Sequence, residues 1–192
     1  MKINSLWLIM ILLFAADPAM AIEEPEYEVL SETDIYEIRR YAPYIVAEVD
    51  VDGDAGSAGN KAFRILAGYI FGDNEDDARM KMTAPVGSQP AGDGANRYTY
   101  AFVMERKYTL ESLPRPDDPR IRLSEVEPRS MAAVRYSGRW TEKNYRQHLA
   151  ELRQALAADG VATRGEPLLA RYNSPFTPWF LRRNEILLEL DD

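Results

Sequence analysis

The stretch Asn60–Val86, NKAFRILAGYIFGDNEDDARMKMTAPV, decides which fold the rest of the chain can build. Its first half carries apolar residues at helical spacing, namely Phe63, Leu66, Ala67 and Ile70. Gly72 follows, where a residue without Cβ ends a helix at low cost. Met80–Pro85 then alternates apolar and polar residues with a period of two. The stretch predicts a helix from Ala58 to Phe71, an acidic turn and a half-buried strand.

Residues 1–21 have the pattern of a secretory signal peptide. Lys2 precedes an apolar run from Leu6 to Ala16, and Ala19-Met20-Ala21 has the form of a cleavage site. The apolar run is short for a bilayer span, although an uncleaved anchor is the alternative. We therefore expect an exported, soluble mature chain from Ile22, located in the periplasm or secreted, with no stable membrane insertion after cleavage.

The charge and composition exclude several classes of partner and site. The net charge is −8, and loss of Lys2 and Asp17 with the signal peptide leaves it unchanged. Such an acidic chain does not suit nucleic acid or an anionic membrane. With no cysteine and one histidine, most structural metal sites are excluded. The length of the mature chain predicts a single domain over 22–192.

Further elements follow from the alternation of apolar and polar residues. It predicts strands at 27–30, 35–41, 45–51, 98–105, 121–126, 130–136, 168–172 and 185–190. Residues 89–96 are expected to form a polar hairpin connection. Thr141 is a candidate cap for a second helix that Gly160 ends. The face of this helix is apolar: Tyr145, Leu149, Leu152 and Leu156.

The two halves of the chain have matching patterns. Pro43 precedes Val46, Ala47 and Val49 at the same spacing as Pro128 precedes Met131, Ala132 and Val134. A helix and further strands follow each motif, at an offset of about 85 to 90 residues. We interpret this as a duplicated β-α-β-β unit, with pseudo-repeats at about 27–105 and 106–192. The fold class predicted is α+β, with a curved antiparallel sheet or distorted barrel and two helices on one side.

Support for catalysis is weak. His148 is the only histidine, and its position at the edge of a helix core face suits a structural role better than a catalytic one. The chain has no thiol, no nucleophile elbow and no glycine-rich phosphate loop. The carboxylate pairs Asp76–Asp77 and Asp117–Asp118 both lie in predicted loops, where solvated charge is usual. We expect no enzymatic activity.

Ligand binding has better support. The loop Asn173–Asn184, NSPFTPWFLRRN, gathers aromatic side chains between prolines, and it is either a lid folded on the core or an exposed apolar surface. The first helix carries residues outside its core stripe that could form an opposing wall. The predicted binding residues are Lys61, Arg64, Ile65, Gly68, Tyr69, Phe176, Trp179 and Phe180. Together they would suit a planar, acid-bearing molecule.

Five blocks resemble the SOUL haem-binding protein family, in the same order and over about 27–190. The blocks are YEIRRYAPYIVAEV, AFRILAGYIFGDNE, MKMTAPV, ARYNSP and RRNEILLEL. The resemblance implies a distorted antiparallel barrel with two helices, built from a duplicated unit. It also implies non-covalent binding of haem or a related tetrapyrrole, without catalysis. Transport or buffering of that molecule is the role expected.

The chain departs from some members of that family at Arg40, where those members have a histidine proposed as the iron ligand. A charged arginine cannot bind iron. The resemblance then implies a mainly hydrophobic site without an axial histidine. Burial of the ring gives on the order of 10 kcal/mol, which association costs reduce to an affinity near micromolar. A metal ligand is not assigned: Tyr69, Met82 and His148 are the alternatives.

A second hypothesis stays open. The duplicated unit also resembles the effector-binding domains of bacterial regulators, which accept varied hydrophobic molecules. The chain would then bind another hydrophobic small molecule, or a protein partner in the periplasm, with no role for haem.

Overall fold

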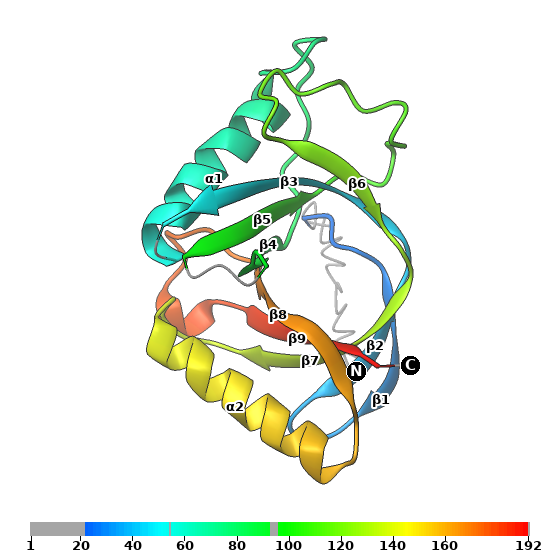
Figure 1. Ribbon diagram of the computed structural model, residues 1–192, viewed down its shortest axis with the longest axis vertical. Coiled ribbons are helices and arrows are strands. Elements are labelled where there is room, and N and C mark those ends of the chain that lie inside the picture. Colours follow the sequence, from blue (N-terminus) through cyan, green and yellow to red (C-terminus); the bar gives the residue numbers. More distant parts are fainter. Residues whose placement is uncertain (1–21, 54, 93–95, 192) are drawn as a thin grey trace, which may run out of the picture.

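The strands of this protein form one curled antiparallel sheet, and two helices pack on its outer face (Figure 1). The structure is a computed structural model that describes residues 22–53, 55–92 and 96–191. The predicted signal peptide lies outside the described residues. The elements are β1 (Tyr27–Glu32), β2 (Glu37–Tyr41), β3 (Tyr44–Asp52), α1 (Ala55–Phe71), β4 (Val86–Pro90), β5 (Arg97–Val103), β6 (Arg122–Val126), β7 (Arg129–Tyr136), α2 (Glu142–Ala158), β8 (Thr163–Arg171), the 3-10 turn η1 (Trp179–Leu181) and β9 (Asn184–Leu190).

The order of the strands shows the predicted duplication. In the nine-stranded sheet of the described residues the order is β1-β2-β7-β9-β8-β4-β5-β3-β6. From the central β8–β4 pair outward, the two sides are equivalent: β4, β5, β3 on one side and β8, β9, β7 on the other. Each side is a strand-helix-strand-strand unit, β3-α1-β4-β5 or β7-α2-β8-β9. The predicted α+β fold with a duplicated unit is therefore confirmed.

The two halves also exchange a strand. β2 comes just before β3 in the chain, yet it pairs with β7 of the second half, with Ile38 opposite Ala132. In the same way β6 comes just before β7 and pairs with β3, with Val46 opposite Ser124. The unit β3-α1-β4-β5 is thus completed by β6, which directly precedes the second unit in the chain. The unit β7-α2-β8-β9 is completed by β2, which directly precedes the first unit.

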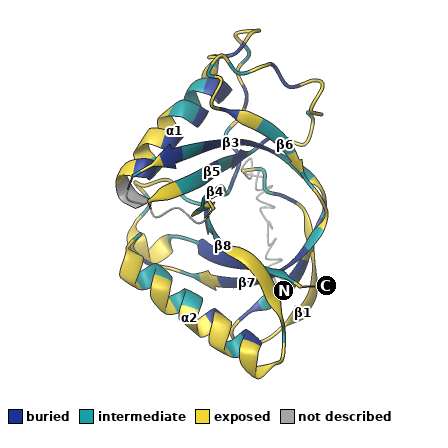
Figure 2. Cartoon of the chain, viewed as in Figure 1, coloured by how far each residue is buried: buried dark blue, intermediate teal, exposed yellow. Residues whose placement is uncertain are grey.

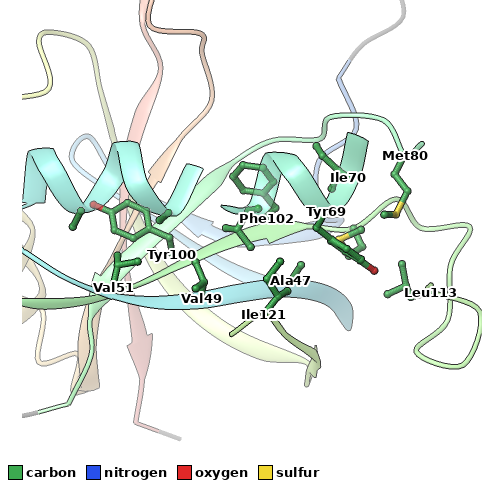
Figure 3. Packing of buried hydrophobic residues seen from close by; sticks show 14 residues of the cluster. Ala47, Val49, Val51, Tyr69, Ile70, Met80, Tyr100, Phe102, Leu113 and Ile121 are labelled. Carbon is green, nitrogen blue, oxygen red and sulfur yellow. The ribbon is translucent and has the colours of Figure 1, made fainter. Parts of the chain in front are cut away.

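The helix α1 packs on β3 and β5 through a stripe that differs in part from the predicted one. Its buried residues are Ala58, Ala62, Leu66, Tyr69 and Ile70. Leu66 and Ile70 are core residues, as predicted, but Phe63 is 44% exposed and Tyr69 is fully buried. The placement of Tyr69 outside the core was therefore wrong. Figure 3 shows Tyr69 between the helix and Leu113, and its hydroxyl donates to the Pro114 carbonyl at 2.9 Å.

The helix α2 begins and ends as the sequence predicts. The Thr141 hydroxyl accepts from the backbone N–H of Asn144, which caps the first turn. Leu152 and Leu156 are buried against β7 and β9, and the opposite side of the helix is exposed (Figure 2). The chain leaves the helix at Asp159, and Gly160 has a positive φ. Within the described ranges, neither helix is long and apolar enough to cross a membrane.

The prediction of a strand at Met80–Pro85 was wrong, because the strand after α1 is β4, at Val86–Pro90. Three backbone N–H groups of this segment have partners outside any ladder: Met80 donates to the Ile70 carbonyl, Lys81 to the Glu105 carboxylate and Ala84 to the Glu23 carbonyl. The alternation of burial still holds at Met80 and Lys81, but with these three donors bonded elsewhere the segment does not join the sheet. The hairpin connection is correspondingly shorter than the predicted 89–96.

Candidate functional site

The loop between β8 and β9 presents its aromatic side chains to solvent. Phe176 is 93% exposed, Trp179 49% and Phe180 58%, and Leu181 beside them is 64% exposed. Of the two alternatives for this segment, the exposed surface is the one found. Since soluble chains rarely expose several large apolar residues together, this aromatic loop (residues 173–183) has the character of a contact surface.

Hydrogen bonds connect the aromatic loop to itself and to the segment after β7. The Arg182 guanidinium donates to the carbonyls of Thr177 at 2.8 Å and Pro175 at 2.7 Å. The backbone N–H of Gly138 donates to the Trp179 carbonyl at 3.0 Å, which fastens η1 to the end of β7. The exposed rings therefore belong to a constrained segment, which reduces the entropy cost of binding a ligand against them.

Trp140 joins this loop to the sheet. Its indole N–H donates to the side-chain oxygen of buried Asn184 at 2.7 Å. The guanidinium carbons of Arg182 and Arg171 lie 4.4 and 5.0 Å from the centroid of the Trp140 ring system. Arg139 lies in turn 5.7 Å from the ring of Trp179. Two arginines thus lie against Trp140 and one against Trp179, at distances typical of cation–π contacts.

Arg171 is the unusual member of this group. It is the last residue of β8, and its Nε is buried without a hydrogen-bond partner among the described residues. Burial lowers the pKa of its guanidinium, and the groups that modulate this shift are Tyr100, Tyr136 and Arg182, none of them a carboxylate. Arg171 is half-buried, and no ion pair with a carboxylate is found for it among the described residues. A guanidinium with a buried, unbonded N–H is suited to receive an anion.

The register of the sheet places Arg171 between the two helices. It pairs with Asn184 of β9 on one side and with Val86 of β4 on the other. Val86 pairs with Phe102 of β5, and the ring of Phe63 from α1 contacts Phe102 edge-on with centroids 5.4 Å apart. Directly paired residues face the same side of a sheet, and strands are about 4.8 Å apart, so Arg171 and Phe102 are roughly 10 Å apart. We call this region the outer aromatic surface, made by Phe63, Tyr136, Trp140, Arg171, Trp179 and Phe180.

The predicted residues on α1 are not among those that make the outer aromatic surface. Lys61 and Arg64 are exposed and make no ion pair with a described residue. Ile65 and Gly68 are half-buried, and helical spacing places them on the opposite flank of α1 from Phe63. A Cβ at Gly68 would collide with the Asp73 carboxylate, so this glycine also has a packing role. Of the exposed α1 residues, it is Phe63 whose ring contacts Phe102 on β5, two strands from Arg171.

The candidate iron ligands are not gathered at one point. The His148 ring stacks on Tyr136 with centroids 4.3 Å apart, and its Nδ1 lies 2.9 Å from a Glu151 carboxylate oxygen. Tyr69 is buried, and burial raises its pKa to about 12. Arg40, which stands where some family members have histidine, is exposed on β2. The described residues contain no group of three or more His, Cys, Asp or Glu that could hold a metal ion.

Sequence reasoning missed Arg171, Trp140 and Tyr136. Arg171 lies within the block ARYNSP, and period-two alternation places it on the face opposite Ala170 and Tyr172. That signal was available, but a strand pattern does not reveal that the facing elements provide indoles and no carboxylate. Trp140 lies in the short connection between β7 and α2, which has no periodic pattern. Only the tertiary structure shows that it contacts Arg171 and Arg182.

Two cavities lie elsewhere in the described structure, and none of the eight predicted residues lines either. One, of about 160 Å³, lies on the inner face of the curled sheet. That volume is below the 300 Å³ or more usual for pockets that enclose drug-sized ligands. The other, of about 390 Å³, has a rim rich in carboxylates: Glu23, Glu24, Glu26, Glu105, Glu111 and Glu125. Such a rim repels an acidic ligand.

Comparisons with known proteins agree with this architecture. Over most of its length the chain is similar to heme-binding protein 2 of Mus musculus, with 29% identity over 187 residues, covering 88% of this chain and 90% of the mouse protein. Two solved structures share the fold. The first is the EcmrR C-terminal domain, with 12% identity and a TM-score of 0.63; the match covers 86% of this chain and 98% of the EcmrR domain. The second is a protein described as a hydrolase from Listeria innocua, with 15% identity and a TM-score of 0.57; the match covers 84% of this chain and 94% of the Listeria protein. The sequence pattern described as SOUL heme-binding protein matches residues 22–189. The chain therefore belongs to the SOUL heme-binding protein family.

Proposed function

We propose that this protein binds haem or a related tetrapyrrole on the outer aromatic surface, with Arg171 receiving a carboxylate of the ligand. The observation that carries this proposal is the buried Nε of Arg171, which has no partner among the described residues. The names of relatives such as the mouse heme-binding protein 2 support the class of ligand.

The surface combines two kinds of contact that a tetrapyrrole with acidic side chains needs. Exposed rings of Trp179, Phe180 and Phe63 provide apolar area for the macrocycle. Arg171, with Arg139 and Arg182 around the indoles, provides positive charge for carboxylates. Arginine suits this role because its planar guanidinium forms paired hydrogen bonds with a carboxylate.

Binding in this proposal does not depend on an axial histidine. His148 is stacked flat on Tyr136, and Arg40 cannot act as a ligand to iron. Ring contacts and carboxylate pairing supply the affinity instead. We accordingly propose that haemin and metal-free protoporphyrin bind with similar affinities, near the micromolar range estimated from area and association costs.

Haemin titration of the Arg171→Met variant tests the site. We expect a saturable Soret shift in the unaltered protein and an affinity at least tenfold lower in the variant, because a charge-assisted hydrogen bond is lost. The variant should fold normally, since an unbranched apolar side chain replaces a half-buried arginine whose Nε has no hydrogen-bond partner among the described residues. Arg40→Met is the matched control, because Arg40 is an exposed strand arginine outside the surface.

The esterified ligand provides a second test. Protoporphyrin dimethyl ester has no free carboxylate, so its affinity should be the same for the unaltered protein and Arg171→Met. An equal loss of affinity for the ester and the acid would show that the substitution acts through packing. Unchanged haemin binding in Arg171→Met would refute the proposed site.

The residues predicted on α1 and the loop can be separated by the same titration. Trp179→Ala and Phe180→Ala should each weaken haemin binding through lost ring contact. Arg64→Glu tests whether the solvent-exposed face of α1 contributes, and we expect a small effect because Arg64 is exposed and lies about 100° around the helix from Phe63. Lys61, Ile65 and Gly68 lie farther around the helix, on the flank opposite Phe63.

The biological role belongs to the proposal too. We infer a binding, transport or buffering function outside the cytoplasm rather than catalysis, supported by the pattern of residues 1–21 and by the lack of a nucleophile motif. Export can be tested by separating the cytoplasmic and extracytoplasmic fractions of the cells that produce the protein and sequencing its N-terminus. A mature N-terminus at Ile22 in the extracytoplasmic fraction is the expected result, and an intact Met1 in the cytoplasm would refute export.

A further inference from the structure

The inner face of the curled sheet encloses a cavity that is separate from the outer aromatic surface. Its volume is about 160 Å³, and it opens between strands of both halves of the sheet. Apolar residues make most of the wall, among them Val46, Val103, Met131, Leu168 and Leu187. Pro25, in the segment before β1, also lines it. The cavity therefore has room and apolar surface for a small organic molecule.

Three hydrogen-bond donors at this cavity lack acceptors in the described structure. Arg129 lines the cavity, and its Nε is buried without a hydrogen-bond partner. The Tyr44 hydroxyl accepts from Arg129 Nη2 at 3.1 Å, and the Tyr41 hydroxyl accepts from Arg39 Nη1 at 3.2 Å. Each hydroxyl still has its own proton to donate, because these bonds use only its acceptor capacity.

The balance of charge around the cavity favours an anion. Glu189 is shared between Arg129, at 3.4 Å, and Arg164, at 2.7 Å, so one carboxylate serves two guanidinium groups. The carboxylate that lines the cavity, Glu48, is paired with Arg122 at 3.1 Å. Arg122 also pairs with Asp50, but Asp50 has a second partner in Arg97, so these two carboxylates are matched by two guanidinium groups. The positive charge in excess at the cavity is thus that of Arg129.

We propose that the inner cavity is a second binding site, for a small carboxylic acid with a compact apolar body. An apolar cavity of about 150 Å³ accepts a benzene-sized molecule, so one ring or a short branched chain fits, whereas a tetrapyrrole does not. The carboxylate accepts hydrogen bonds from Arg129 Nε and from the hydroxyls of Tyr41 and Tyr44. The apolar body packs against Met131 and Leu187.

Benzoate is the probe, with benzamide and benzylamine as neutral and cationic molecules of similar shape. Titration is followed by calorimetry and by NMR of protein labelled at its methionine methyl groups. Met131 lines the cavity, whereas Met80 and Met104 belong to the core beneath α1. We expect benzoate to shift the Met131 signal in a saturable way and to leave the other two nearly unchanged. Benzamide should bind more weakly, and benzylamine more weakly still.

Two substitutions test the contacts, each with a matched control. Arg129→Met should lower benzoate affinity at least tenfold, while Arg164→Met removes the other partner of Glu189 and should have little effect. Ala101→Leu places a larger side chain in the cavity wall and should abolish binding. Ala157→Leu, on the exposed side of α2, is the control for that exchange.

The two sites are independent, so their tests separate. Ala101→Leu should leave haemin affinity unchanged, and Arg171→Met should leave benzoate affinity unchanged. An absent Met131 shift at saturating benzoate, equal binding of benzylamine, or full binding by Ala101→Leu would each overturn the inner site. None of these results would bear on the outer one.

Discussion

Arg39 donates to the carboxylate of Glu185 at 2.7 Å, and the two side chains are 2% and 0% exposed. Glu185 also accepts from Arg183 at 2.9 Å and from the Tyr172 hydroxyl at 2.9 Å. This ion pair connects β2 to β9, which are separated by β7 in the sheet. It therefore links the exchanged strand of one half to the last strand of the other.

We expect Glu185→Gln to lower the free energy of unfolding by about 3 kcal/mol, because the substitution removes the fully buried carboxylate that Arg39 and Arg183 share. Buried Arg39 is then left with only the partly exposed Glu37, whose carboxylate lies 2.6 Å from its Nε. Urea denaturation measures this difference. Glu189→Gln is the control, since its arginine partners are 27% and 52% exposed and such pairs contribute about 1 kcal/mol or less. Equal losses in the two variants would contradict the role assigned to burial.

The same pair predicts how stability changes in acid. Burial alone would raise the pKa of Glu185, but the bonds from Arg39 and Arg183 outweigh it and hold the pKa below its ordinary value. The stabilisation is therefore present above the unfolded-state pKa near 4.5 and is lost as pH falls through the folded-state pKa. Between pH 6.5 and 3.5, the unfolding free energy should fall more in the unaltered protein than in Glu185→Gln. If the unfolding free energies of the two proteins fell in parallel with pH, this interpretation would be contradicted.

Tyr69→Phe distinguishes a core residue from a binding residue. The change removes the hydroxyl that donates to the Pro114 carbonyl, and we expect a loss of about 1 to 2 kcal/mol of stability. Haemin affinity should not change, because the ring is buried beneath α1. Thermal unfolding and the Soret titration measure the two effects, and a weakened titration would restore Tyr69 to the binding site.

His148→Ala tests the absence of an axial histidine. Since His148 is stacked on Tyr136 and its Nδ1 is close to Glu151, we expect the Soret maximum and the haemin affinity to change little. Absorption and electron paramagnetic resonance spectra of the haemin complex measure this. A spectrum that changes its coordination type in the variant would identify His148 as a ligand.

The fold could be predicted because its signals are local. The apolar face of 142–158, the cap at Thr141 and the matching spacing after Pro43 and Pro128 are each contained in short segments. Met80–Pro85 shows where such reasoning fails, since its alternation is real but its backbone donors bond to Glu23, Ile70 and Glu105. Those partners are distant in sequence and have no local signature.

The site could be predicted only in part, for a related reason. The aromatic loop was visible because Phe176, Trp179 and Phe180 stand together in the chain. The charge of Arg171 carries no such mark, because what distinguishes it is the lack of a nearby carboxylate after folding. Tyr69 was predicted outside the core for a similar reason. Its position next to the core stripe of the helix does not show that the loop at Pro114 packs over its side chain and buries it.

The exchange of β2 and β6 between the halves means that neither repeat carries a finished sheet of its own. A fragment cut between Val103 and Arg122 would leave β3 without β6 in one piece and β7 without β2 in the other. The β4–β8 pair would be separated as well, so each fragment would expose unpaired strand edges prone to self-association. Produced together, the two pieces should recombine into a heterodimer, because each supplies the strand that completes the sheet of the other.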